Sequence, residues 1–299
     1  MLEKLLGNDA VKRDLAAALR EGRLSHCVLL CGEEGTGANF AARCLAADYL
    51  YPDGGDGARL VLRGESAEVL CVQGEGVSGE IRTERVREVR RAVFETALSA
   101  HGRCVLIRSA QKLNAGSANA LLKVLEEPPE GVLFILTADS EAAVLPTVRS
   151  RCAVYSLSPV ARAVCEQQAA QLFPGAARAE VQELCALFGG KLGCVQRCLA
   201  QPEAMQQLKD AKQLAQCAGR ADRYGALCVL SGYEKDRLTA RALLQDTRQI
   251  CAAALRGDTA LLNAAAAAAF LPQLAQAESR LAANGNQKLV LTALGMAAG

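Results

Sequence analysis

The sequence contains no tryptophan, and aromatic residues make up only 4% of its 299 residues. A core for this chain must therefore be built from Leu, Val, Ile, Ala and Cys, which favours many small helices. No apolar run reaches the roughly 18 residues that a membrane-spanning helix needs, and the opening residues include Glu3 and Lys4. We therefore expect a protein that is neither exported nor inserted into a membrane.

The 13 cysteines include no Cys-x-x-Cys pair, the spacing typical of zinc and redox motifs. Because most of them fall within apolar helical patterns, disulfides are not expected and the sequence predicts a reducing, cytoplasmic location. Cys194 and Cys198 lie one helical turn apart. A shared metal is the alternative to two small buried side chains there, but no second pair accompanies them, so no metal site is expected.

A large charge of one sign is also missing, because the net charge is only +2 with 22% charged residues. This composition predicts a globular chain and excludes a disordered polycation. Any contact with DNA would need a local basic patch. The candidates are the arginines of one predicted helix, Arg82, Arg85, Arg87, Arg90 and Arg91. Glu84 and Glu88 lie among them, and an ordinary solvated helix face is the alternative.

The first half of the chain alternates between two patterns. Short apolar runs indicate buried strands, and segments with apolar residues at helical spacing lie between them. The runs occupy residues 26–31, 103–108 and 132–137, with a further plausible strand at 67–72. The helical segments occupy residues 9–20, 40–49, 83–97 and 115–125. This alternation predicts an α/β domain with a parallel sheet and helices on both faces.

No strand is expected beyond residues 157–159. The sequence therefore predicts three domains, an α/β domain over 1–159, a small helical domain over 160–202 and a larger helical domain over 203–299. In the last of these, the alanine tract 264–269 is expected to form a tightly packed helix bounded by residues 270–272, which end in Pro272.

A glycine-rich turn joins the first predicted strand to the next helix. A phosphate-binding P-loop requires Gly-x-x-x-x-Gly-Lys-Ser/Thr at such a turn. Gly32, Gly35 and Gly37 keep the glycine frame, but Ala38 stands at the lysine position and Asn39 at the hydroxyl position. The loop thus lacks the usual positive charge and the usual magnesium ligand.

The strand that should end in magnesium-binding carboxylates, residues 103–107, is followed by Arg108. Without the lysine, the hydroxyl and the carboxylates together, phosphoryl transfer loses its charge stabilisation, so ATP hydrolysis and a bound cofactor are not expected. The favoured interpretation of the glycine loop is a tight turn that the fold requires. Weak binding of an anion at the helix N-terminus is the alternative.

Residues 117–129, Ser-Ala-Asn-Ala-Leu-Leu-Lys-Val-Leu-Glu-Glu-Pro-Pro, closely resemble the signature of bacterial clamp-loader subunits of the AAA+ ATPase family. Residues 145–152, which end in Ser-Arg-Cys, resemble a second motif of that family. The resemblance implies a P-loop NTPase (AAA+) domain, a small helical lid domain and a C-terminal helical collar. Because delta-prime subunits often lose the ATPase residues, the degenerate loop points to that type. Gly193, where the ATPases are expected to place a sensor arginine, agrees with a silent site.

The resemblance also implies a role and partners. Arg151 would be an arginine finger that acts in trans on ATP held by a neighbouring gamma/tau ATPase subunit, and Ser150 and Cys152 would shape the turn that presents it. The chain would be the stationary member of a clamp loader that also contains a clamp-opening delta subunit and primed DNA. Whether it touches the DNA directly is left open.

One feature departs from this resemblance. Many delta-prime proteins carry a four-cysteine zinc module, but residues 50–70 contain no cysteine. The alternatives are an ATP-binding gamma/tau-type subunit, a separate AAA+ DNA-remodelling factor and a scaffold whose Arg151 has no finger role.

Overall fold

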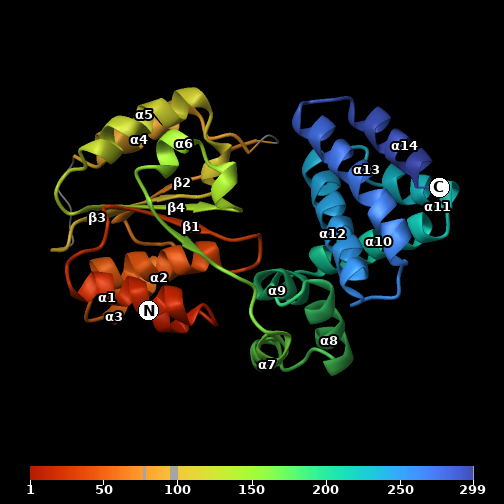
Figure 1. Ribbon diagram of the computed structural model, residues 1–299, viewed down its shortest axis with the longest axis horizontal. Coiled ribbons are helices and arrows are strands. Elements are labelled where there is room, and N and C mark those ends of the chain that lie inside the picture. Colours follow the sequence, from red (N-terminus) through yellow and green to blue (C-terminus); the bar gives the residue numbers. More distant parts are fainter. Residues whose placement is uncertain (77–78, 95–99, 299) are drawn as a thin grey trace. The chain divides into compact units, whose positions relative to one another are not determined.

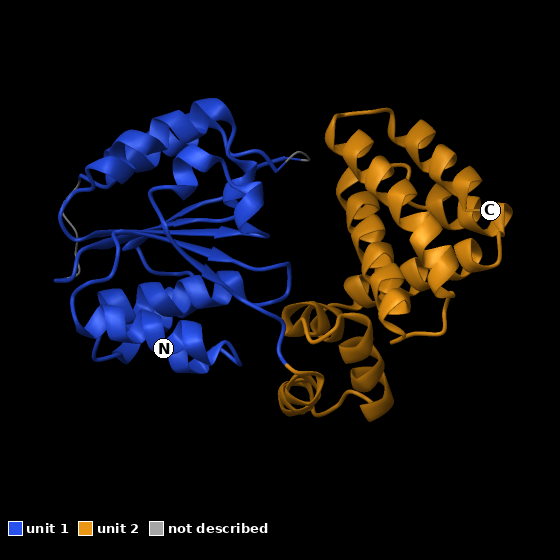
Figure 2. Ribbon diagram, in the orientation of Figure 1, with its two compact units in different colours: residues 1–160 blue, residues 161–299 orange. Residues whose placement is uncertain are grey.

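The computed structural model describes residues 1–76, 79–94 and 100–298. The chain forms two compact units, Met1–Val160 and Ala161–Gly299 (Figure 2). The division into three domains with a second boundary at residue 202 stays a prediction.

The first unit is built on a five-stranded sheet in which all pairs of strands are parallel. The strand order is β2-β3-β4-β1-β5. The strands are β1 (Cys27–Cys31), β2 (Val69–Val72), β3 (Arg103–Ile107), β4 (Val132–Ala138) and β5 (Ala153–Ser156). Every residue of β1, β3 and β4 is buried, which explains their continuous apolar sequences, because helices cover both faces of a parallel sheet.

Helices cover the two faces of this sheet (Figure 1). On one face lie α1 (Asp9–Arg20), α2 (Ala38–Leu50) and α3 (Gly55–Arg63), and on the other lie α4 (Thr83–Ala92), α5 (Ala115–Glu126) and α6 (Pro146–Arg149). Val28 and Leu30 of β1 belong to the core beneath α2, whereas Leu29 belongs to the core beneath α5. The predicted α/β domain with helices on both faces is confirmed.

Three details of the first unit differ from the sequence predictions. Helix α3 was not predicted, because its segment is rich in Gly and Asp, yet Ala58 and Val61 are buried on one face. Strand β5 was missed because it is short, and no residue of it is fully buried at the edge of the sheet. The helix predicted over 83–97 ends at Ala92, and residues 95–97 of that prediction lie outside the described residues.

The second unit is helical throughout its described residues, as predicted. Its helices are α7 (Arg162–Leu172), α8 (Arg178–Leu187), α9 (Leu192–Ala200), α10 (Pro202–Gly219), α11 (Arg223–Ser231), α12 (Arg237–Arg256), α13 (Ala264–Ala282) and α14 (Gln287–Ala297). The predicted boundary at Pro272 is wrong, because α13 continues through it. The apolar face explains this: Ala267, Phe270, Leu274, Ala277 and Leu281 are buried on both sides of the proline. Among the described helices, none has the length and apolar character needed to cross a membrane.

Candidate functional site

The glycine loop lies between the C-terminal end of β1 and the start of α2, which is where open parallel sheets bind ligands. Gly35 and Gly37 have φ angles of +86° and +97°, which L side chains rarely adopt. A Cβ on Gly32 would lie 3.0 Å from the carbonyl oxygen of Leu157 and would also meet the hydroxyl of Thr36. Backbone geometry therefore accounts for these three glycines, with or without a nucleotide.

The loop is closed on itself by Thr36. Its hydroxyl and its backbone N–H both donate to the carbonyl oxygen of Glu33, at 2.7 and 3.0 Å. Glu33 and Glu34 bring two carboxylates into the same loop, and negative charge opposes the approach of a phosphate. Ala38, at the lysine position, is buried and supplies no cation to a phosphate.

The other two altered positions, Asn39 and Arg108, are joined directly. The Asn39 side-chain oxygen accepts from Arg108 Nε at 3.3 Å and from the Thr137 hydroxyl at 3.0 Å. Arg108 Nη1 also donates to Gln73 Oε1 at 3.1 Å. Thr137 Oγ1 in turn accepts from the backbone N–H of Ser109 at 3.2 Å. The C-terminal ends of β2, β3 and β4 and the start of α2 therefore meet in one polar network.

In a standard P-loop site, the positions of Asn39 and Arg108 would hold the hydroxyl and the carboxylates that bind magnesium. The network holds an amide, a hydroxyl and a guanidinium, of which the guanidinium repels cations. The nearby carboxylate Asp139 accepts from Gln111 at 2.7 Å. Among the described residues, no group of three or more His, Cys, Asp or Glu could hold a metal ion. Cys194 and Cys198 are both buried in α9.

Sequence reasoning identified Asn39 and Arg108 but missed Thr137 and Gln73. Thr137 was visible as the polar residue at the end of an otherwise apolar run. Its meeting with Asn39 follows only from the strand order, which brings β4 beside β1.

Arg151 lies at the N-terminal end of the parallel strands, whereas the glycine loop lies at their C-terminal end. It precedes β5, whose register with β1 pairs Val28 with Ala153 and Cys31 with Ser156. By this register Arg151 falls about six residues before Gly32, or about 20 Å at roughly 3.3 Å per residue. Arg151 is therefore too far away to contact an anion in the loop of its own chain.

The guanidinium of Arg151 forms an ion pair with Glu126, the last residue of α5. It also donates to the Thr147 carbonyl at 2.8 Å and contacts the Ser150 hydroxyl at 3.4 Å. The side chain remains 32% exposed. Sequence reasoning missed Glu126, although it lies in the signature segment.

Ser150 and Cys152 both bond to carbonyl groups of the preceding helical turn. Ser150 donates to Thr147 at 3.2 Å, and Cys152 donates to Val148 at 3.2 Å. The Cys152 sulfur also lies 3.0 Å from the sulfur of Cys27. The hydrogen bond to Cys152, with burial, raises the pKa of the Cys27 thiol, and the bond from Cys27 lowers the pKa of Cys152.

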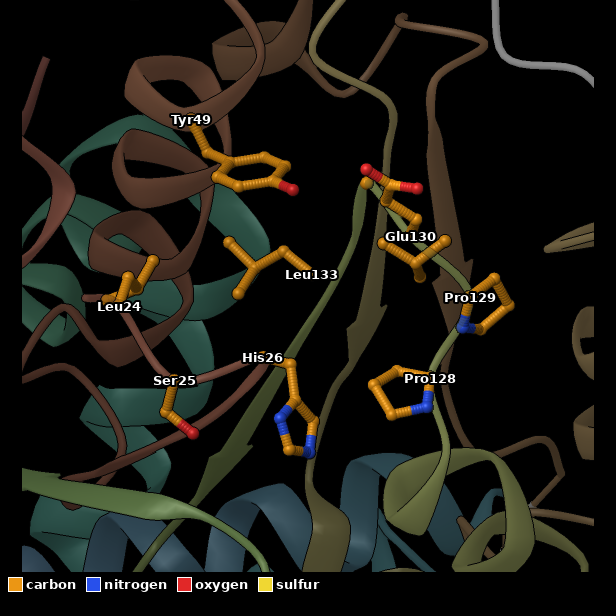
Figure 3. Close-up of a pocket in the computed structure, with 10 residues that line it drawn as sticks. Leu24, Ser25, His26, Tyr49, Pro128, Pro129, Glu130 and Leu133 are labelled. Atoms are coloured by element: carbon orange, nitrogen blue, oxygen red, sulfur yellow. The ribbon is translucent and has the colours of Figure 1, made fainter. Parts of the chain in front are cut away.

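A small pocket of about 250 Å³ lies near the N-terminal ends of β1 and β4 (Figure 3). Tyr49, Glu130 and Leu133 surround one part of it, and His26 and Ser25 another. His26 Nε2 already lies within hydrogen-bond distance of the Leu125 carbonyl, at 2.8 Å. Burial raises the pKa of the Tyr49 phenol and keeps it neutral. These groups do not form a nucleophile and base pair, so no reaction is assigned to this pocket.

Two further predicted features can be placed. Gly193 lies in the first turn of α9. The neighbouring Lys191 is buried and donates to Gln249 of α12 at 2.9 Å, so its charge is engaged inside the second unit.

Helix α4 carries the predicted arginine-rich face. Its Arg85 forms an ion pair with Glu88 at 2.9 Å, as expected for Arg85 if this face is an ordinary solvated one. A DNA-facing role for the helix stays a prediction.

Comparison with known proteins agrees with this architecture. The chain is 30% identical over 181 residues to the DNA polymerase III subunit delta' of Pseudomonas aeruginosa, covering 58% of this chain and 55% of that protein. It is 29% identical over 157 residues to the delta' subunit of Bacillus subtilis, covering 50% and 47%. The gamma subunit of Buchnera aphidicola is 31% identical over 158 residues, covering 51% and 44%. The chain thus spans about half the length of the curated relatives it matches.

Solved structures show the fold alone. A DNA polymerase III gamma subunit-related protein from Thermotoga maritima matches with a TM-score of 0.54 and 18% identity, covering 94% of this chain and 97% of that one. A variant of Thermotoga maritima RuvB matches with a TM-score of 0.50 and 15% identity, covering 82% and 70%. The predicted AAA+ fold is thereby confirmed.

The family described as "DNA polymerase III, delta subunit" matches residues 7–161, which include the glycine loop, the polar network and the turn of Arg151. This match spans more than half of the 299 residues. The chain therefore belongs to the DNA polymerase III delta/delta' family of clamp-loader proteins.

Proposed function

We propose that this chain is the delta-prime type subunit of a bacterial clamp loader, a stationary AAA+ subunit that does not hydrolyse ATP. Sequence identity does not distinguish a delta-prime subunit from a gamma/tau-type subunit, because a delta' relative and a gamma relative match at 30% and 31%. The observation that carries the proposal is the Arg108–Asn39–Thr137 network. It fills the place of the magnesium site with neutral groups and a cation, whereas an active subunit needs the opposite charge there.

Isothermal titration with ATP and magnesium tests this proposal. The natural chain is expected to give no saturable heat. The variant A38K/N39T/R108D restores all three group types to the same loop, and it serves as the matched positive control, for which measurable magnesium-dependent binding is expected. Tight magnesium-dependent binding to the natural chain would overturn the proposal in favour of a gamma/tau-type subunit.

Arg151 would be the chemical contribution of this subunit. Its partly exposed guanidinium lies about 20 Å from its own glycine loop, so its target would be ATP on a neighbouring ATPase subunit. A planar and permanently charged guanidinium can contact two phosphate oxygens at once, and such fingers change hydrolysis rates by on the order of a thousandfold or more.

The test is the ATPase rate of a loader reconstituted with the gamma/tau and delta subunits. R151A is expected to lower kcat strongly, while R149A, which removes a neighbouring arginine paired with Glu141 at 3.7 Å, leaves it near the natural value. Equal rates for R151A and the natural chain would reduce the protein to a scaffold.

The second unit would supply the collar through which the subunit assembles with these partners. From Ala264 to Ser279 the exposed residues of α13 carry no charge. On α14, which packs against α13, the exposed side chains after Lys288 are also uncharged and include Leu289 and Met296. Exposed uncharged faces of this kind are typical of surfaces that a partner covers. Primed DNA would lie within the assembled loader.

A further inference from the structure

Cys27 and Cys152 are opposite each other on neighbouring parallel strands. The register that pairs Val28 with Ala153 brings Cys27, the first residue of β1, beside Cys152, which directly precedes β5. Neighbouring strands lie about 4.8 Å apart, which is within the range of Cα separations found in disulfides, roughly 4.4–6.8 Å. The two sulfur atoms are 3.0 Å apart. Both are free thiols.

We propose that Cys27 and Cys152 form an oxidative modification site, in which a peroxide converts the two thiols to an intramolecular disulfide that alters the presentation of Arg151. The formation of the disulfide depends only on the geometry of the first unit. Its effect on Arg151 rests on the proposed function.

Cys152 is the thiol that the oxidant reaches, because it is partly exposed whereas Cys27 is fully buried. Cys152 first loses its proton to the solvent, and its thiolate then attacks hydrogen peroxide. The O–O bond breaks, the departing hydroxide takes up a proton to form water, and Cys152 becomes a sulfenic acid. The Cys27 sulfur then attacks the Cys152 sulfur. The S–S bond forms, the S–O bond breaks, and the departing hydroxide takes the Cys27 proton. In total, two thiols and one peroxide give one disulfide and two waters.

The surroundings favour this pair over the other close pair of cysteines. A hydrogen bond from the partner thiol lowers the pKa of Cys152 and, in the other pair, that of Cys185, so solvent access is what distinguishes the two pairs. Cys165 and Cys185 lie 3.3 Å apart in the second unit, but both are fully buried, so an aqueous oxidant meets neither sulfur directly. Cys71 and Cys228 are exposed, and they are replaced in the test below to prevent cross-linking between chains.

Closing the disulfide changes the turn of Arg151 in two ways. Cys152 loses the S–H that donates to the Val148 carbonyl, and the two sulfurs, now 3.0 Å apart, approach each other by about 1 Å in total to reach the bond length of about 2.05 Å. Displacements of about 1 Å in a catalytic group can cost on the order of 100-fold in rate. Oxidation is therefore expected to lower the ATPase of the reconstituted loader by roughly tenfold or more.

The modification is tested on the isolated full chain with Cys71→Ser and Cys228→Ser. After treatment with hydrogen peroxide, we expect the mass to fall by two hydrogens, a linked peptide to contain Cys27 and Cys152, and dithiothreitol to reverse both. C152S keeps a hydroxyl donor for Val148 and should abolish the linkage, whereas C185A in the buried pair should leave it unchanged. Free Cys27 and Cys152 after treatment, or a linkage that maps to other cysteines, would overturn the proposal.

The consequence for Arg151 is tested separately, with oxidised and reduced chains in the reconstituted loader. The C27A variant, which cannot form the disulfide, should keep its ATPase after peroxide treatment. If R151A lowers the ATPase but the mapped disulfide does not, the proposed effect on Arg151 is wrong. If R151A has no effect, the finger role fails while the mapped disulfide still stands.

Discussion

Glu126 occupies the guanidinium of Arg151 in the free chain and so competes with any phosphate that Arg151 would bind. The two side chains form an ion pair, and they are 32% and 51% exposed. A pair of this exposure contributes about 0.2–1 kcal/mol. Arg151 must exchange this carboxylate for a phosphate if it acts on a neighbouring ATP. E126Q is therefore expected to raise the ATPase of a reconstituted loader by roughly 1.4- to 5-fold, as measured by phosphate release.

The double variant E126Q/R151A is the control, since Glu126 should have no effect once the arginine is gone. Thermal unfolding should show that E126Q costs less than about 1 kcal/mol of stability. A rate for E126Q as low as that for R151A would mean that Glu126 orients the arginine for its target and does not compete with it.

For single residues, the sequence predicts which site positions are altered better than it predicts which side chains they contact. The changes at Ala38, Asn39 and Arg108 are visible because the P-loop has a fixed spacing and follows an apolar strand. The partners Thr137 and Glu126 lie far from them in sequence, and they become neighbours only through strand order and packing. The finger role of Arg151 came from the resemblance of the Ser-Arg-Cys segment, and it stays a prediction.

Among the elements, α13 contradicts a local rule. Proline removes a backbone N–H and crowds the carbonyl four residues earlier, at a cost of about 3 kcal/mol in a helix interior. Pro272 is exposed within α13, and buried apolar residues on both sides of it hold the helix together. P272A should therefore stabilise the second unit by about 1–3 kcal/mol, as measured by urea unfolding followed by circular dichroism.

A275P provides the matched control, because Ala275 is exposed on the same helix three residues later. It introduces the same ring where the backbone has not adapted to it, and it should cost about 3 kcal/mol. A loss of stability in P272A would show that the proline makes contacts that its local geometry does not explain.

The other elements show what a pattern can and cannot predict. The strands β1, β3 and β4 were predictable because they are buried on both faces and therefore continuously apolar. The edge strand β5 has no such run, because neighbours cover it on only one side of the ladder. Helix α3 was hidden by its opening Gly-Asp-Gly, although its later residues bury one face.

At the scale of the whole molecule, the two units would have different roles, since the first would act on a neighbouring ATP and the second would bind the partner subunits. The first unit contains the altered loop and the turn of Arg151, which belong to the family match over residues 7–161. The second contains the uncharged exposed faces of α13 and α14, and its sequence lies almost entirely beyond that match. Its helical nature was predictable from composition and spacing, but an assembly surface depends on which side chains remain exposed after packing.

The double variant L289E/M296E tests that surface directly. Leu289 and Met296 are 68% and 51% exposed and seven residues apart on α14, so they lie on one face of the helix. Burying two carboxylates at an apolar interface costs several kcal/mol. The variant should therefore fail to join the gamma/tau and delta subunits in size-exclusion chromatography with light scattering, while its own unfolding midpoint stays within a few degrees of the natural value. L172E, on an exposed residue of α7, is the matched control and should assemble. If L289E/M296E assembled equally well, the partners would have to bind elsewhere, and α14 would lose its place in the proposed collar.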